Sequence, residues 1–107
     1  MIALTPEQRQ TVERQFRSLA ARWSELTHYR SNMGALRGHP VYQELTALGE
    51  PAVPLILREL ERRPSVSWFG LLAEITGEDP VPVESAGRVE AMAESWLEWG
   101  RRRGYLE

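Results

Sequence analysis

The sequence predicts an all-α fold of about five helices in a single domain. Apolar residues recur at helical spacing in five separate stretches, and proline, glycine and serine or threonine residues stand where those stretches begin and end. No stretch alternates apolar and polar residues as a half-buried strand does, and "VPVES" is too short and too rich in proline to form a strand. We therefore expect one domain over residues 1–107, with an N-terminal helix and loop (1–38) followed by helical hairpins (39–107).

The first helix is predicted to begin at "TPEQ", residues 5–8. Thr5 and Gln8 have the spacing of a capping box, in which each side chain binds a backbone N–H of the other residue, and proline suits the first helical position. The pattern continues to about Tyr29, and "RSNMGALRGHP" then predicts a loop. The stripe expected to be buried consists of Val12, Phe16, Leu19, Ala20, Trp23 and Leu26.

Two shorter helices are predicted to follow. The second begins at Pro40, after His39, and ends at Gly49, because glycine suits the end of a helix. The third begins with Pro51 and Pro54 in its first turn, where a missing N–H costs little. Its expected buried stripe is Val53, Ile56, Leu57 and Leu60.

The last two helices are predicted over residues 65–77 and 86–103. Ser65 or Ser67 begins the fourth and Gly77 ends it, while Gly104 ends the fifth. Glu98 and Arg102 have the order and spacing of a favourable ion pair on the fifth helix. The expected buried positions are Trp68, Leu71, Leu72 and Ile75 in the fourth helix, and Val89, Met92, Ala93, Trp96 and Gly100 in the fifth.

The connector "ITGEDPVPVESAG" has two interpretations. Glu78 and Asp79 form an acidic pair that could serve a metal ion or acid–base chemistry. The alternative is a stiff connector, in which Gly77 ends one helix, Asp79 accepts nearby backbone N–H groups and two prolines restrict the chain. We favour the connector, because adjacent side chains in a loop usually diverge and the sequence places no histidine nearby.

Composition excludes several classes of function. The chain has 107 residues, no cysteine and a net charge of −2, so disulfides, thiolate zinc sites and cysteine nucleophiles are excluded. All 13 basic residues are arginine; residues 1–38 carry a net charge of +3 and residues 39–107 one of −5. No signal peptide or apolar run of ~20 residues is present, which predicts a cytoplasmic protein without a membrane partner.

The segments "HPVYQELTALGEPAVPLILREL", "ITGEDPVP" and "WLEWGRRRGY" resemble a small bacterial family of uncharacterised proteins. The part "ALGEPAVPLILREL" is also similar to HEAT repeats, in which a first helix ending in glycine is followed by a second helix. The resemblance implies HEAT-like αα-hairpins and supplies no activity. That family tends to open its fourth helix with His-Trp-Phe-Trp, where this chain has Ser67, Trp68, Phe69 and Gly70.

We predict no catalytic, metal-binding or cofactor-binding residue. His28 and His39 are the only histidines, and neither stands in a known ligand or nucleophile motif with Tyr42 or another residue. His39 before Pro40 is more typical of a residue that begins a helix. We therefore expect a protein that is not an enzyme and binds no cofactor.

The function that these features favour is binding another protein, as an adaptor, a regulator or an antitoxin- or immunity-like subunit of a bacterial assembly. Trp68 and Trp99 are the two tryptophans expected to be partly exposed, and exposed aromatic residues mark binding surfaces. Homo-oligomers are compatible with this function. The candidate partner-binding residues are Trp68, Trp99, Arg101, Arg102, Arg103 and Tyr105.

The alternative function is that of an accessory subunit that contacts nucleic acid within a complex. It depends on the basic residues of the first helix and on Arg101, Arg102 and Arg103, since binding to phosphates is carried by basic side chains. The candidate nucleic-acid-binding residues are Arg9, Arg14, Arg17 and Arg22.

Overall fold

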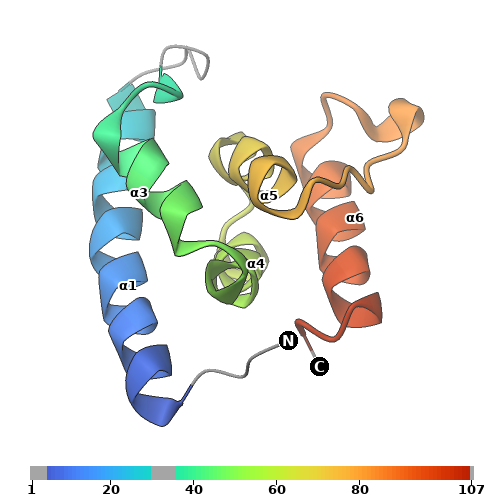
Figure 1. Cartoon of the computed structure of the whole chain (residues 1–107). Coiled ribbons are helices and arrows are strands. Elements are labelled where there is room, and N and C mark those ends of the chain that lie inside the picture. Colours follow the sequence, from blue (N-terminus) through green and yellow to red (C-terminus); the bar gives the residue numbers. More distant parts are fainter. Residues whose placement is uncertain (1–4, 30–35, 107) are drawn as a thin grey trace. The chain divides into compact units, whose positions relative to one another are not determined.

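The computed structural model describes residues 5–29 and 36–106 and confirms the all-α prediction. Within these residues the chain forms five α-helices and three short 3₁₀ helices, and no strand (Figure 1). No helix in the described ranges has both the length and the apolar character needed to cross a membrane. The described residues fall into two compact units, which divide between Ala52 and Val53.

The N-terminal unit consists of α1 (Pro6–Tyr29), α3 (Pro40–Leu48) and the 3₁₀ helix η1 (Glu50–Ala52). The helix α3 packs along α1, which explains why it belongs to this unit (Figure 1). Trp23 of α1 is fully buried, and its ring lies 5.6 Å from that of Tyr42 on α3. The predicted stripe of α1 is buried at its centre and half-buried at Val12 and Leu26.

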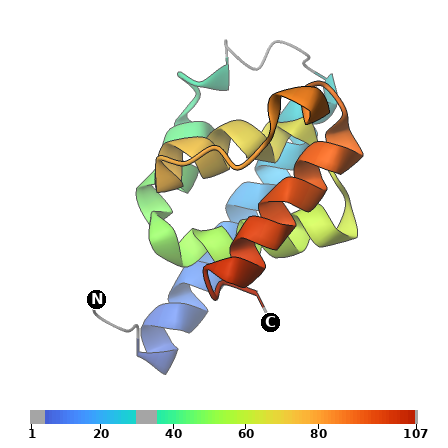
Figure 2. The same ribbon diagram turned by 90° about the vertical axis from the view of Figure 1, so that its right-hand side faces the viewer.

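The C-terminal unit contains α4 (Val53–Arg62), η2 (Val66–Trp68), α5 (Phe69–Thr76), η3 (Val83–Ser85) and α6 (Val89–Arg102). Both α5 and α6 pack against α4, and Figure 2 shows α6 crossing it. Gly100 of α6 permits this close approach, because a Cβ atom there would lie 2.5 Å from Cδ1 of Leu57 on α4. The residues of α4 predicted to be buried, Val53, Ile56, Leu57 and Leu60, are fully buried.

Most of the predicted helix ends are confirmed by their hydrogen bonds. The backbone N–H of Thr5 donates to Gln8 Oε1 at 3.0 Å and the N–H of Gln8 donates to Thr5 Oγ1 at 3.1 Å, which is the predicted capping box. Ser65 accepts a hydrogen bond from the N–H of Ser67 and begins η2. Gly77 ends α5 in the left-handed conformation, with its N–H donating to the carbonyl of Ala73. Residues 30–35 of the predicted loop lie outside the described residues.

Two predicted helix starts were wrong by a few residues. The third predicted helix first makes the 3₁₀ turn η1, which contains Pro51, and becomes α-helical at Val53. Tight 3₁₀ turns are frequent at the starts of α-helices. The last helix begins at Val89 and not at residue 86, because Gly87 has a φ of +85° and Arg88 is extended.

The connector of residues 77–88 is a series of hydrogen-bonded turns. Asp79 Oδ1 accepts the N–H of Val81 at 3.2 Å, as predicted for a stiff connector. The N–H groups of Ser85, Ala86 and Arg88 donate to carbonyls three residues earlier. Glu78 and Asp79 have different partners, since the side chain of Glu78 reaches Arg103. The acidic pair therefore diverges, as expected for adjacent residues in a loop.

Candidate protein-binding surface at the end of α6

The C-terminal end of α6 is closed by a Schellman motif. Gly104 has a φ of +82°, and its N–H donates to the carbonyl of Arg101 at 3.2 Å. The N–H of Tyr105 donates to the carbonyl of Gly100 at 2.8 Å. These two bonds, together with the left-handed glycine, define the motif and turn the chain back over the helix. The predicted end at Gly104 is confirmed, and the turn places Tyr105 beside the last turns of α6.

Tyr105 packs on Trp99, which is the centre of a cluster of aromatic and charged side chains. The two rings are stacked, with centroids 5.4 Å apart. Trp96 meets Trp99 edge-to-face at 5.3 Å, and the guanidinium carbon of Arg103 lies 5.6 Å from the Trp99 centroid. A cation at this distance from an indole ring is held by a cation–π interaction. Trp99 therefore fixes the positions of both Tyr105 and Arg103.

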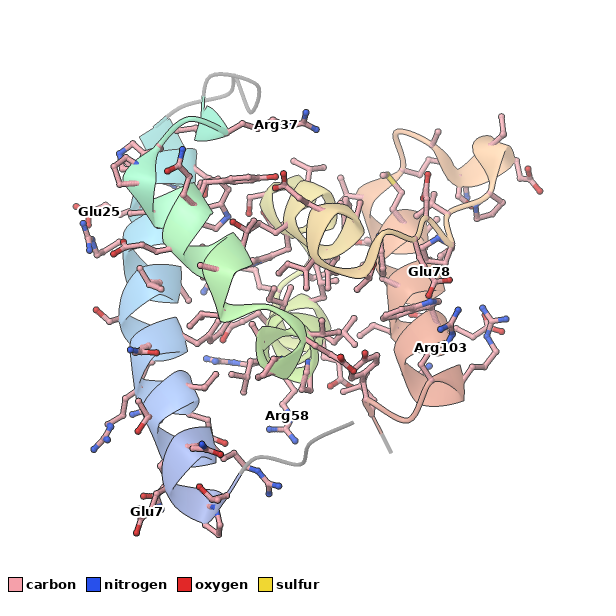
Figure 3. The ribbon with its side chains drawn as sticks, viewed as in Figure 1. Glu7, Glu25, Arg37, Arg58, Glu78 and Arg103 are labelled. Carbon is pink, nitrogen blue, oxygen red and sulfur yellow. The ribbon has the colours of Figure 1, made fainter. Side chains whose placement is uncertain are left out.

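Glu78, which lies in the connector of residues 77–88, also contacts Arg103. Arg103 Nη2 donates a hydrogen bond to Glu78 Oε1 at 2.5 Å, and Figure 3 shows the two side chains directed toward each other. The side chain of Arg103 is 53% exposed and that of Glu78 is 36% exposed. An ion pair with this exposure contributes about 1 kcal/mol or less to stability, so its main effect is on the orientation of the guanidinium.

The other two arginines of the triplet are also exposed. Arg101 lies 3.9 Å from Glu94, a distance too long for a hydrogen bond. The predicted pair between Glu98 and Arg102 is not formed, and Arg102 has no ion-pair partner in the part of the chain that the structure describes. Arg62 pairs with Glu59 inside α4 at 3.3 Å. We call the set Glu78, Trp99, Arg102, Arg103 and Tyr105 the C-terminal surface.

The expectation that Trp68 and Trp99 are partly exposed was wrong. Their exposed fractions are 4% and 5%. The 3₁₀ turn η2 directs Trp68 inward and leaves Val66 at the exposed position, while the Schellman motif folds Tyr105 over Trp99. Trp99 therefore packs beneath Tyr105 and Arg103 and is not itself exposed to solvent.

The indole N–H of Trp99 is buried and has no hydrogen-bond partner among the described residues. Leaving a buried donor unpaired costs about 1–3 kcal/mol, so this position is less stable than a fully satisfied core position.

The candidate nucleic-acid-binding residues lie on α1. All four of these arginines are exposed: Arg9, Arg14, Arg17 and Arg22. The same helix carries Glu7, Glu13 and Glu25, so that four arginines against three glutamates leave it a net charge of only +1. The net positive charge of α1 is therefore small.

An open groove of about 380 Å³ lies between α1 and α3 in the N-terminal unit. Leu19, Ala47 and Leu48 contribute its apolar lining, while Arg22 and Glu44 are charged residues on its two helices. The groove combines few apolar groups with one charge of each sign, and this mixture does not identify a ligand.

His39 and Tyr42 have structural roles in the N-terminal unit. His39 begins α3, and its Nδ1 accepts the N–H of Val41 at 3.1 Å, which confirms the prediction that it is a helix-start residue. Tyr42 is 5% exposed and packs on Trp23. No group of three or more histidine, aspartate or glutamate side chains within residues 5–29 and 36–106 has the geometry of a metal site.

Substituting His39 tests its role as a helix cap. We expect His39→Ala to lower the free energy of unfolding by about 1 kcal/mol, because the N–H of Val41 loses its acceptor. His39→Asn, which retains an acceptor at this position, should preserve most of the stability. Urea denaturation of the three proteins measures both effects. Equal stability of the alanine and asparagine variants would show that the hydrogen bond contributes nothing.

Glu78 was not predicted to belong to the surface. Glu78 and Arg103 are 25 residues apart, and no local pattern connects a connector residue with the end of the last helix. The adjacency of Trp99 and Arg103 could be inferred, because residues i and i+4 are neighbours on a helix.

Comparisons of the chain with known protein families, curated proteins and solved structures give no match.

Proposed function

We propose that this protein is a non-enzymatic protein-binding module, acting as an adaptor, a regulator or an antitoxin- or immunity-like subunit of a bacterial assembly. The observation that supports the proposal is the C-terminal surface, where Arg103 is exposed and yet held in one orientation by Glu78 and Trp99. The segment of residues 47–60 is similar in sequence to HEAT repeats, and stacked HEAT repeats form extended concave surfaces that bind other molecules.

Preorganisation is the physical reason that this surface favours binding. Ordering a long side chain at an interface costs about 0.5–1.5 kcal/mol of binding free energy. The cost is smaller when the free protein already holds the side chain in place. Arginine and tyrosine are also enriched among the residues that dominate binding energy. A role limited to stabilising the helix dipole would need only positive charge in the last turn and no contact with Glu78 or Trp99.

The second candidate is an accessory subunit that contacts nucleic acid through α1. The exposure of Arg9, Arg14, Arg17 and Arg22 favours it. The net charge of +1 on α1 opposes it, because affinity for phosphates rises with the number of basic groups that neutralise them. We therefore place protein binding first.

The proposal is tested by recovering the tagged protein from its native host. We expect a stoichiometric protein partner to be recovered with the wild type and lost with the double substitution R102Q/R103Q, after nuclease treatment of the extract. Arg88→Gln is the matched control, since Arg88 is an exposed arginine at the opposite end of α6. Quantitative mass spectrometry measures recovery, and sedimentation of the purified protein distinguishes a foreign partner from self-association.

The absence of any stoichiometric partner, together with a monomer in sedimentation, would contradict the proposal. A partner that is lost on nuclease treatment, and that depends on Arg14 and Arg17 instead, would favour the nucleic-acid alternative.

A further inference from the structure

The arginines at the end of α6 differ in their surroundings. Trp99, Arg102 and Arg103 are related by three and four residues and therefore lie on one face of the helix. Arg101 falls on the other side, 3.9 Å from Glu94, and Glu98 lies one turn before both Arg101 and Arg102. Arg102 and Arg103 therefore flank Trp99 one turn further along the helix, and of the two only Arg103 lies over its ring.

Arg103 retains donors for a second acceptor. A guanidinium has five N–H groups in a planar fork, and the hydrogen bond to Glu78 uses one of them on Nη2. The side chain remains 53% exposed, and contact with Trp99 restricts its position. Arg102 is exposed and has no ion-pair partner within the described residues. Two exposed guanidinium groups, one on each side of Trp99, therefore offer unused donors.

Carboxylate is the acceptor that these donors fit. The fork of a guanidinium matches the two oxygens of a carboxylate, and Arg103 already binds one from this chain at 2.5 Å. A phosphate group accepts the same hydrogen bonds from a guanidinium. The net charge around the two arginines is therefore used to choose between a protein carboxylate and a nucleic-acid phosphate as the ligand. The C-terminal unit has seven arginines against ten acidic residues, a net charge of −3, and acidic residues line the adjacent part of α6. A long polyanion such as nucleic acid would be repelled beyond the arginine pair, whereas a short acidic segment would not.

We propose that Arg102 and Arg103 form a carboxylate-binding site for an acidic peptide segment of a protein partner. The inference rests on the proposed function and names the chemistry of the partner. Glu78 is the internal carboxylate of this site: it orients Arg103 and, through its negative charge, also weakens the attraction for an incoming carboxylate. Tyr105, stacked on Trp99, forms the adjoining wall of the site.

The test uses a fluorescein-labelled glutamate-rich peptide and the full-length protein at low salt, with fluorescence anisotropy as the measurement. We expect R102Q and R103Q each to weaken binding about two- to fivefold, which corresponds to a solvent-exposed ion pair. Glu78→Gln keeps an oxygen acceptor for Arg103 and removes a negative charge, so it should strengthen binding about twofold. Arg88→Gln, with the same change in net charge as R102Q, should leave the affinity unchanged.

Thermal denaturation of each variant separates loss of binding from loss of folding. A peptide affinity that is equal in the wild type and in R102Q/R103Q overturns the inference, as does a Glu78→Gln variant that binds the peptide less tightly than the wild type. A single-stranded oligonucleotide of the same charge is the second probe, and tighter binding to it than to the peptide also overturns the inference.

These outcomes are distinguishable from failure of the proposed function. If recovery of a partner from the host persists in R102Q/R103Q while peptide binding is absent, the protein is still a binding module, and its partner uses another surface. If both are absent, neither proposal holds.

Discussion

Replacing Trp96 with alanine is expected to lower the free energy of unfolding by about 3–5 kcal/mol. Trp96 is 1% exposed and lies on the face of α6 that packs toward α4 and against Trp99. Removing its ring loses the burial of a large apolar surface and leaves a cavity that close-packed neighbours fill only in part. A domain of this size has a total stability of about 5–15 kcal/mol, so the loss is a large part of it.

The control for this experiment is Val83→Ala. Val83 is 89% exposed in η3, and its truncation should change stability by less than about 0.5 kcal/mol. Urea denaturation, followed by circular dichroism, measures both variants. A Trp96→Ala protein that is as stable as Val83→Ala would show that Trp96 does not lie in a packed core.

Replacing Gly100 with valine is expected to destabilise the protein by about 3 kcal/mol, at the upper end of the usual cost of overpacking. A Cβ atom at this position would lie 2.5 Å from Cδ1 of Leu57 and 3.4 Å from Cδ1 of Leu106. Leu57 is fully buried and cannot move without disturbing its neighbours. Either the side chain of Leu57 has to change rotamer and displace its packed neighbours, or α4 and α6 have to move apart.

A double-mutant cycle checks this mechanism. Leu57→Ala alone should cost about 2–5 kcal/mol, and combined with Gly100→Val it should cost less than the sum of the two, because the new side chain occupies the vacated space. Gly70→Ala in α5 is the matched control: a Cβ atom there has no neighbour within 4 Å, so stability should be unchanged or slightly higher. Additive effects at positions 57 and 100 would show that the two residues do not compete for the same space.

The positions of the helices followed from local patterns. The capping box of Thr5 and Gln8, the cap at His39 and the glycines at positions 77 and 104 act through hydrogen bonds within a few residues. Such signals can be read directly from a sequence, because both partners of each bond lie in the same short stretch. The two wrong starts, at Val53 and Val89, occurred where 3₁₀ turns and a left-handed glycine precede the α-helix.

The sequence by itself determined the all-α class, the spans of the helices and most of their buried stripes, since these depend on residue spacing and on caps. The tertiary structure decided that Trp68 and Trp99 are buried, and that Glu78 reaches Arg103 across 25 residues. Helical periodicity shows which residues share a face, but burial at the edge of a face depends on which other segment covers it. For Trp99 that segment is the turn carrying Tyr105, which stacks on the same indole ring that Arg103 contacts.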